Sequence, residues 1–264
     1  MEDETVNTEM SACQLLKCAL MLGRRLLECG AEIYRVEESV ERICLSYGAR
    51  SVDVYAVPTA IVATMQQADG AILTQSSRIK SRGTDLDRVR ALNALCRSVC
   101  AQPICYKDFQ RSLQQIDAQP SYSNRTLCFA CGGIAAFFTL LFGGQVPEAL
   151  LSFVIGFFVQ ILTAFVNRLN VHTLFSNVLG GIWIGFISLL GAALGIAPHY
   201  DVVIIGAIMP LVPGLLITNS IRDMIAGDFM AGISRFFEAL ISAGAIAAGA
   251  AIPFSLESLW IGVL

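Results

Sequence analysis

The chain has 264 residues, of which 55% are hydrophobic, and its mean hydropathy is +0.63. An ordinary soluble domain is roughly 45 to 50% apolar, so the composition indicates a membrane protein. The formal net charge of −3 and the absence of a Lys/Arg cluster argue against nucleic-acid binding, which requires a basic surface.

The charged residues divide the chain into two parts. Residues 1–125 hold 15 Lys and Arg and 15 Asp and Glu, whereas residues 126–264 hold three arginines and six acids. Segments of such different polarity belong in different solvents. We therefore predict a cytoplasmic α+β domain over residues 1–125 and a membrane domain over residues 126–264. The acidic start of the chain does not resemble a signal peptide, and the nine cysteines, all between Cys13 and Cys131, are typical of a reducing compartment.

The first part of the chain combines helical and strand patterns. Apolar residues at helical spacing predict four helices, at about 11–29, 31–48, 85–102 and 107–117. Gly30 and Gly48 end the first two runs as C-cap glycines do. Three β-rich runs predict a small antiparallel sheet, at 51–57, 60–66 and 71–77.

The second part contains five runs long enough to cross a hydrocarbon core, which requires roughly 20 residues. They lie at about 127–143, 149–166, 173–196, 202–219 and 229–252. Arg125, Arg168 and Arg222 all fall on one side of this arrangement, and positive charge marks the cytoplasmic side. We therefore expect an integral membrane protein with a cytoplasmic N-terminus and an external C-terminus.

The fourth predicted span contains Pro210 and Pro213, with Gly214 directly after. Proline lacks the N–H that a helix requires, so this span should be broken. Irregular backbone at membrane depth survives only where protein or a wet cavity surrounds it, and broken helices build substrate sites in secondary transporters. A packed proline kink is the alternative.

Asp228, just before the fifth predicted span, lies on one helical face with Arg235 and Glu238 of that span. An arginine inside a membrane helix costs about 2.5 to 3.5 kcal/mol on insertion scales and usually faces a bundle interior or a cavity. Its planar donors match a carboxylate, so Arg235 is a candidate substrate-binding residue at the depth of the break. Glu238 or Asp228 is a candidate proton carrier. The alternative is a buried Arg235–Glu238 pair that only fixes packing.

Several other polar or small residues can be explained either by helix packing or by a role in transport. Alanines at every fourth position from Ala239 to Ala251, and the pair Gly181 and Gly185, predict close helix contacts. Asn177 is a polar group that either lines a path or bonds to another helix. In the first part, the alternating charges from Glu32 to Arg42 are typical of a solvated ladder of ion pairs.

The sequence offers little for an enzyme or a metal site. It contains no nucleophile motif, phosphate-binding loop or GxGxxG sequence, and His172 and His199 form no ligand set. The CxxC sequence at 128–131 has no second pair and is read as apolar filler. We expect no catalytic residue, no metal and no cofactor.

Three stretches together resemble a known family. "GAEIYRVEESVERIC" at 30–44, "TAIVAT" at 59–64 and "PLVPGLLITNSIRDMIAGDFMAGISR" at 210–235 are similar to the threonine/serine exporter family in its short split form. The resemblance covers essentially the whole chain. The family's motif maps onto six residues of this sequence: Pro210, Pro213, Gly214, Asn219, Asp223 and Gly227.

The resemblance implies export of small carboxylates, threonine and serine in some members and succinate in others, across the cell inner membrane and coupled to protons. It also implies that this chain is one subunit, whose partner is a second, smaller membrane protein. Substrate binding is then expected at Pro210, Pro213, Gly214, Asn219 and Arg235. Proton coupling is expected at Asp223, Asp228 and Glu238. The competing class is a membrane-anchored sensor or binding module whose cytoplasmic domain binds a small ligand, although a tether would not need Arg235, Glu238 and a broken span.

Overall fold

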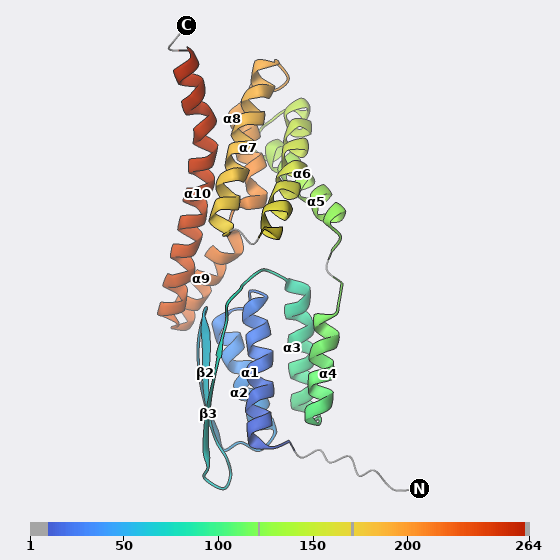
Figure 1. The fold of residues 1–264 in the computed structure, drawn as a ribbon, viewed down its shortest axis with the longest axis vertical. Coiled ribbons are helices and arrows are strands. Elements are labelled where there is room, and N and C mark those ends of the chain that lie inside the picture. The colour runs from blue at the N-terminus through green and yellow to red at the C-terminus, as the bar shows by residue number, and fades with distance from the viewer. Residues whose placement is uncertain (1–9, 121, 170–171, 262–264) are drawn as a thin grey trace, which may run out of the picture. The chain divides into compact units, whose positions relative to one another are not determined.

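The computed structural model describes residues 10–120, 122–169 and 172–261 (Figure 1). These residues form two compact units. The first unit contains the described residues up to Pro120 together with Thr218–Phe236. The second unit contains the described residues of 121–217 together with those from Phe237 onward. The division at 125/126 expected from the charges is close to the first of these boundaries, but the first unit also includes a segment from late in the chain.

The part of the first unit before Pro120 combines four helices with one antiparallel sheet of order β1-β2-β3 (Figure 1). The helices are α1 (Ala12–Glu28), α2 (Ile33–Ser46), α3 (Leu86–Ala101) and α4 (Tyr106–Asp117), and the strands are β1 (Ser51–Val57), β2 (Ala60–Gln66) and β3 (Ile72–Arg78). The α+β architecture predicted from the sequence is therefore confirmed for this unit. In the register, Tyr55 pairs with Val62, and Val62 pairs with Ser76.

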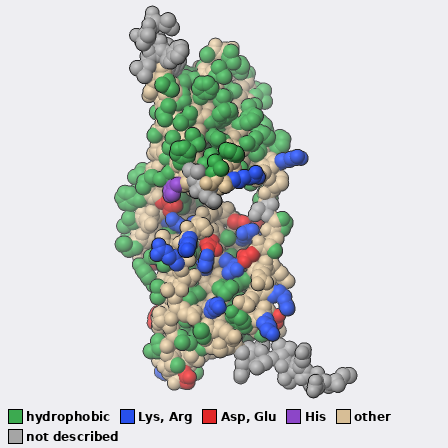
Figure 2. Space-filling view, in the orientation of Figure 1, with side chains coloured by type: hydrophobic (Ala, Val, Ile, Leu, Met, Phe, Trp, Pro, Cys, Tyr) green, Lys and Arg blue, Asp and Glu red, His purple; other side chains and the backbone are tan. Residues whose placement is uncertain are grey.

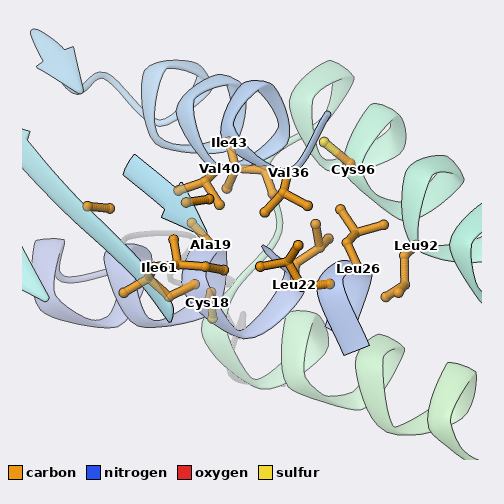
Figure 3. Packing of buried hydrophobic residues seen from close by; sticks show 14 of the residues in the cluster. Cys18, Ala19, Leu22, Leu26, Val36, Val40, Ile43, Ile61, Leu92 and Cys96 are labelled. Atoms are coloured by element: carbon orange, nitrogen blue, oxygen red, sulfur yellow. The ribbon is translucent and has the colours of Figure 1, made fainter. Parts of the chain in front are cut away.

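A core of large aliphatic side chains holds the first unit together. Leu22 and Leu26 of α1 lie against Val36 and Val40 of α2 (Figure 3), and Ile61 of β2 completes this part of the core. All five side chains are fully buried. Burial of one such side chain contributes about 1.5 to 3 kcal/mol, so this core is the main source of the unit's stability.

The turn between α1 and α2 requires a glycine. Gly30 has φ of +89°, in the left-handed region that side chains with a Cβ rarely adopt. A Cβ at this position would also lie 2.9 Å from the carbonyl oxygen of Gly83. The turn from Gly30 to Ile33 is therefore held in one conformation, and it presents its backbone groups to other parts of the unit.

The second unit is a bundle of apolar helices. It contains α5 (Asn124–Leu141), α6 (Val146–Arg168), α7 (Thr173–Ala193), α8 (Tyr200–Ile208), the 3₁₀ turn η1 (Met209–Leu211) and most of α10 (Phe229–Ile261). Helix α9 (Gly214–Ala226) begins in this unit and continues in the first one. In the described ranges, four helices are long and apolar enough to cross a membrane, or five if α8 and α9 together form one broken span. This range includes the five spans predicted from the sequence.

Small residues make the helix contacts of the second unit. A Cβ on Gly185 of α7 would lie 2.7 Å from the carbonyl oxygen of Ala250 in α10, and one on Gly249 would collide with Val178. The close packing predicted at Gly181 and Gly185 is thus confirmed. Hydrophobic side chains cover much of the visible surface of the second unit, whereas charged side chains gather on the first (Figure 2).

Candidate functional site

The first turn of α2 is capped by a residue 190 positions away in the sequence. The first four N–H groups of a helix have no partner within the helix, and the N-cap residue Glu32 makes no side-chain bond to them. Instead, the backbone N–H of Ile33 donates to Oδ1 of Asp223 in α9 at 3.1 Å. A carboxylate at a helix N-terminus is also favoured by the helix dipole. Asp223 therefore stabilises the start of α2.

The carbonyl groups of the same turn accept hydrogen bonds from two other side chains. Asn219 Nδ2 donates to the carbonyl oxygen of Gly30 at 3.0 Å, and Arg235 Nη2 donates to that of Ala31 at 2.8 Å. Both donors come from the segment Thr218–Phe236, which belongs to the first unit. We call Asn219, Asp223 and Arg235 the turn clamp, because together they bind the backbone of the turn from Gly30 to Ile33.

Two members of the turn clamp form a buried ion pair. Arg235 Nη1 lies 3.0 Å from Asp223 Oδ2, and the two side chains are 5% and 0% exposed. Removing one partner of such a pair is strongly destabilising, because it leaves a charge without compensation in a low-dielectric site. Protonation of Asp223 would weaken both the ion pair and the cap on Ile33. The turn clamp is therefore able to couple a proton to the state of this turn.

A second ion-pair network lies beside the turn clamp. Glu32 pairs with Arg222 of α9 at 2.7 Å and with Arg35 of α2 at 3.1 Å. Burial acts to raise the pKa of Glu32, but its backbone hydrogen bond and the two arginines outweigh burial and hold this pKa below its usual value. Glu32 is thus held as a carboxylate that joins α2 to α9.

The pKa of a glutamate within α2, Glu37, is shifted in the opposite direction. Glu37 is half-buried and accepts a hydrogen bond from the backbone N–H of Ala56 at 2.7 Å. Burial raises its pKa, and the negative charges of Asp228 and Asp223 raise it further, against the effect of that hydrogen bond. Burial also raises the pKa of Asp228. The first unit therefore contains Glu32, a carboxyl group with a lowered pKa, as well as Glu37 and Asp228, carboxyl groups with a raised pKa.

The break predicted in the fourth span is present in the second unit. Helix α8 ends at Ile208, η1 contains Pro210, and α9 begins at Gly214, directly after Pro213. The two helices are bent by 59° at this point. The N–H of Val212 donates to the carbonyl of Met209 at 3.3 Å, so the 3₁₀ turn restores part of the hydrogen bonding that a continuous helix would provide.

The predicted site residues are divided between the two units. Asn219, Asp223, Asp228 and Arg235 lie in the first unit, whereas Pro210, Pro213, Gly214 and Glu238 lie in the second. Asn219, Asp223 and Arg235 are brought together around the turn from Gly30 to Ile33, whereas Asp228 makes a backbone hydrogen bond to Asp223. The binding of a substrate by Arg235 at the depth of the break stays a prediction, as does each of the other assigned roles.

Local sequence patterns did not indicate that residues of α9 and α10 would bind the turn from Gly30 to Ile33. The ion pairs expected along α2 are present, between Glu32 and Arg35 and between Glu38 and Arg42. However, Glu32 also binds Arg222, which no local pattern indicates. One signal was available: the turn and the clamp lie in two of the three stretches that carry the family resemblance.

Comparison with known proteins supports that resemblance. The threonine/serine exporter family model matches residues 17–257. A threonine/serine exporter of Corynebacterium glutamicum is 25% identical over 185 residues, which are 67% of this chain and 37% of that protein. An uncharacterized protein of Schizosaccharomyces pombe is 26% identical over 167 residues, 60% of this chain and 20% of that protein. The chain thus matches well under half the length of each relative. No solved structure matches.

Proposed function

The chain belongs to the threonine/serine exporter family, and we propose that it is a subunit of a secondary exporter that moves small carboxylates out of the cell, driven by the proton gradient. The proposed solutes are threonine and serine, with a dicarboxylate such as succinate as the second candidate. The proposed location is the inner membrane, with the N-terminus in the cytoplasm and the C-terminus outside.

The observation that carries this proposal concerns helix α9. This helix starts at the proline break between α8 and α9, and it carries two residues of the turn clamp, Asn219 and Asp223. Helix α9 runs without interruption from Gly214, at the break, to Ala226, and it carries Asp223 of the clamp. Its 13 residues correspond to about 20 Å at 1.5 Å per residue. Continuous helical backbone therefore links the break to a buried carboxylate. Such a connection is what a proton-driven transporter needs.

The proposal includes a second membrane subunit that completes the transport path. Of the predicted alanine ridge on α10, Ala239 is buried, whereas Ala243, Ala247 and Ala251 are exposed. Small residues on a membrane helix allow another helix to approach closely. We therefore place the contact with the smaller partner subunit on this exposed part of the ridge.

Transport by reconstituted vesicles tests the proposal. Vesicles would hold this chain, its partner subunit, or both, and be loaded with threonine, serine or succinate. With both subunits present, we expect release of one of these solutes to increase when a pH gradient is imposed. Neither subunit alone should transport. Release that ignores the pH gradient, or none with both subunits, would contradict the proposal. Ligand binding by the first unit without transport would instead support the sensor alternative.

The orientation has a separate test. In a variant lacking the nine native cysteines, a cysteine replacing Glu257 should react with a membrane-impermeant reagent added to intact cells. A cysteine replacing Asp3 should be protected until the cells are opened. The reverse labelling pattern would show that the proposed orientation is wrong.

A further inference from the structure

The buried face of α7 carries polar groups near its N-terminal end. Ser176 and Asn177 lie within the first two turns of this helix and are 2% and 7% exposed. Asn177 Nδ2 donates to Oγ of Ser242 in α10 at 2.6 Å, and Ser242 is also buried. All three residues belong to the second unit. A hydroxyl and an amide from two different helices are thus joined inside an apolar bundle.

These groups lie at the level of the helix break. Gly180 is one turn after Ser176 on the same face of α7, and a Cβ on Gly180 would lie 2.9 Å from Cδ1 of Leu211. Leu211 is the last residue of η1, the 3₁₀ turn that contains Pro210. The break therefore packs against α7 one turn away from the polar groups, within the same unit.

Two polar atoms on this face of α7 have no hydrogen-bond partner among the described residues. Ser176 Oγ is buried and makes no hydrogen bond to any of the described residues. The same is true of Nε1 of Trp183, which follows Ser176 by seven residues and so lies on the same helical face. A buried polar group without a partner typically costs about 1 to 3 kcal/mol, and most such groups in proteins are satisfied. Among the described residues, Ser176 Oγ and Trp183 Nε1 therefore have unused capacity for hydrogen bonds to a bound molecule.

The facing helix adds a carboxyl group one turn before Ser242. Glu238 of α10 precedes Ser242 by four residues, so both side chains leave the same face of the helix. Glu238 belongs to the second unit as well and is half-buried. A carboxylate is the natural partner of an ammonium group, whereas it repels a second carboxylate.

We propose that Ser176, Asn177, Ser242 and Glu238 form a solute site for a small hydroxy amino acid, next to the break at Pro210. The proposal rests on the proposed export function and deepens it. Hydroxyl and amide groups both donate and accept hydrogen bonds, so Ser176 and Asn177 are suited to the side-chain hydroxyl of threonine or serine. Glu238 is suited to the ammonium group. The carboxylate of Glu238 would repel the second carboxylate of a dicarboxylate, so the site should favour the amino acid.

Substitution of Ser176 tests the site, because the chain offers a matched control. Ser188 lies on the same helix, is fully buried, and also has an Oγ without a hydrogen bond among the described residues. It is twelve residues further along, which is about 18 Å at 1.5 Å per residue. Both Ser176→Ala and Ser188→Ala remove only a hydroxyl, so neither should prevent folding.

The measurement is export of threonine and of valine, which has a methyl group in place of the hydroxyl, by vesicles with both subunits at matched abundance. We expect the wild type to prefer threonine and Ser176→Ala to lower the threonine/valine ratio about tenfold, since sites built to bond a hydroxyl reject the analogue that lacks it. Ser188→Ala should keep the wild-type ratio. Glu238→Gln should reduce threonine export and raise succinate export relative to it.

The outcomes separate this inference from the proposed function. Wild-type export of threonine with an unchanged threonine/valine ratio in Ser176→Ala would overturn the site while leaving the exporter in place. Equal losses in Ser176→Ala and Ser188→Ala would also overturn it, because packing alone would then explain both. Wild-type vesicles that export neither amino acids nor succinate would overturn both proposals.

Discussion

The two units are built on opposite packing rules. In the first unit the large side chains are inside: Phe109 and Leu22 are fully buried. In the second unit large side chains are outside, as with Phe137 at 74% and Phe165 at 60% exposed, while Gly156 is buried. Water drives large apolar groups together, whereas lipid is as apolar as they are and leaves close packing of small residues to hold helices. Each unit is therefore suited to a different solvent.

The buried polar groups of the two units differ in the same way. The first unit buries a charged pair, Asp223 with Arg235, and each of the two side chains also makes one hydrogen bond to the backbone of a turn. At the level of its break, the second unit buries the neutral pair Asn177 and Ser242. The charged pair is the more fragile of the two, because loss of either partner leaves a buried charge. The predictions that follow use this difference.

Asp223→Ala should have the largest effect on stability. It removes the cap on Ile33 and leaves Arg235 without its carboxylate, so we expect a loss of about 3 to 5 kcal/mol in the first unit. Hydrogen exchange of the first amides of α2, in the full-length protein, measures the loss. Arg222→Ala is the control, since the Arg222 side chain is 56% exposed and Glu32 keeps its ion pair with Arg35, so the loss should be about 1 kcal/mol or less. Equal effects of the two variants would contradict a special role for the buried pair.

Gly181→Ala should have the next largest effect and should act on the second unit. The added methyl group would collide with the backbone of α10 at Ile246, and overpacking of this kind costs about 1 to 3 kcal/mol. Thermal unfolding of the protein in detergent measures it. For the control Gly244→Ala, a Cβ meets nothing within 4 Å, so it should be neutral or stabilising. A destabilised control with an unaffected Gly181→Ala would refute the packing rule assigned to this unit.

The smallest effects concern the pH dependence of the first unit. The pKa of Glu32 is lowered on folding, so its stabilising contribution is present above its unfolded pKa and is lost as the pH falls through the folded value. The pKa of Glu37 is raised, so its ionisation destabilises the fold as the pH rises from the unfolded to the folded value. At pH 7, Glu32→Gln should therefore cost about 1 kcal/mol or less, whereas Glu37→Gln should be neutral or stabilising. Hydrogen exchange of the α2 amides at pH 5 and pH 7 distinguishes the two variants. A loss of stability at pH 7 in both variants would refute the opposite pKa shifts assigned to Glu32 and Glu37.

Local patterns predicted much of this structure. The strands β1 and β2 match the predicted runs, and Pro210 with Pro213 predicted the break correctly, because alternation and proline act within a few residues. The turn clamp was not predictable in this way, since Asp223 and Ile33 are 190 residues apart. No local pattern indicated that Arg235 groups with the first unit. The helix α10 has 33 residues, about 50 Å at 1.5 Å per residue, which exceeds a hydrocarbon core of about 30 Å. Its first turns can therefore belong to the first unit.

The most direct test of the account is export by Arg235→Lys, with the partner subunit present and at matched membrane abundance. Lysine keeps the charge but offers a single nitrogen, whereas Arg235 uses one nitrogen for Asp223 and another for the carbonyl of Ala31. If the turn clamp couples protons to export, this variant should remain folded and lose about tenfold or more of its pH-driven export, at roughly 1.4 kcal/mol for each factor of ten. Wild-type export with an unchanged dependence on the pH gradient would show that the clamp only holds the first unit together.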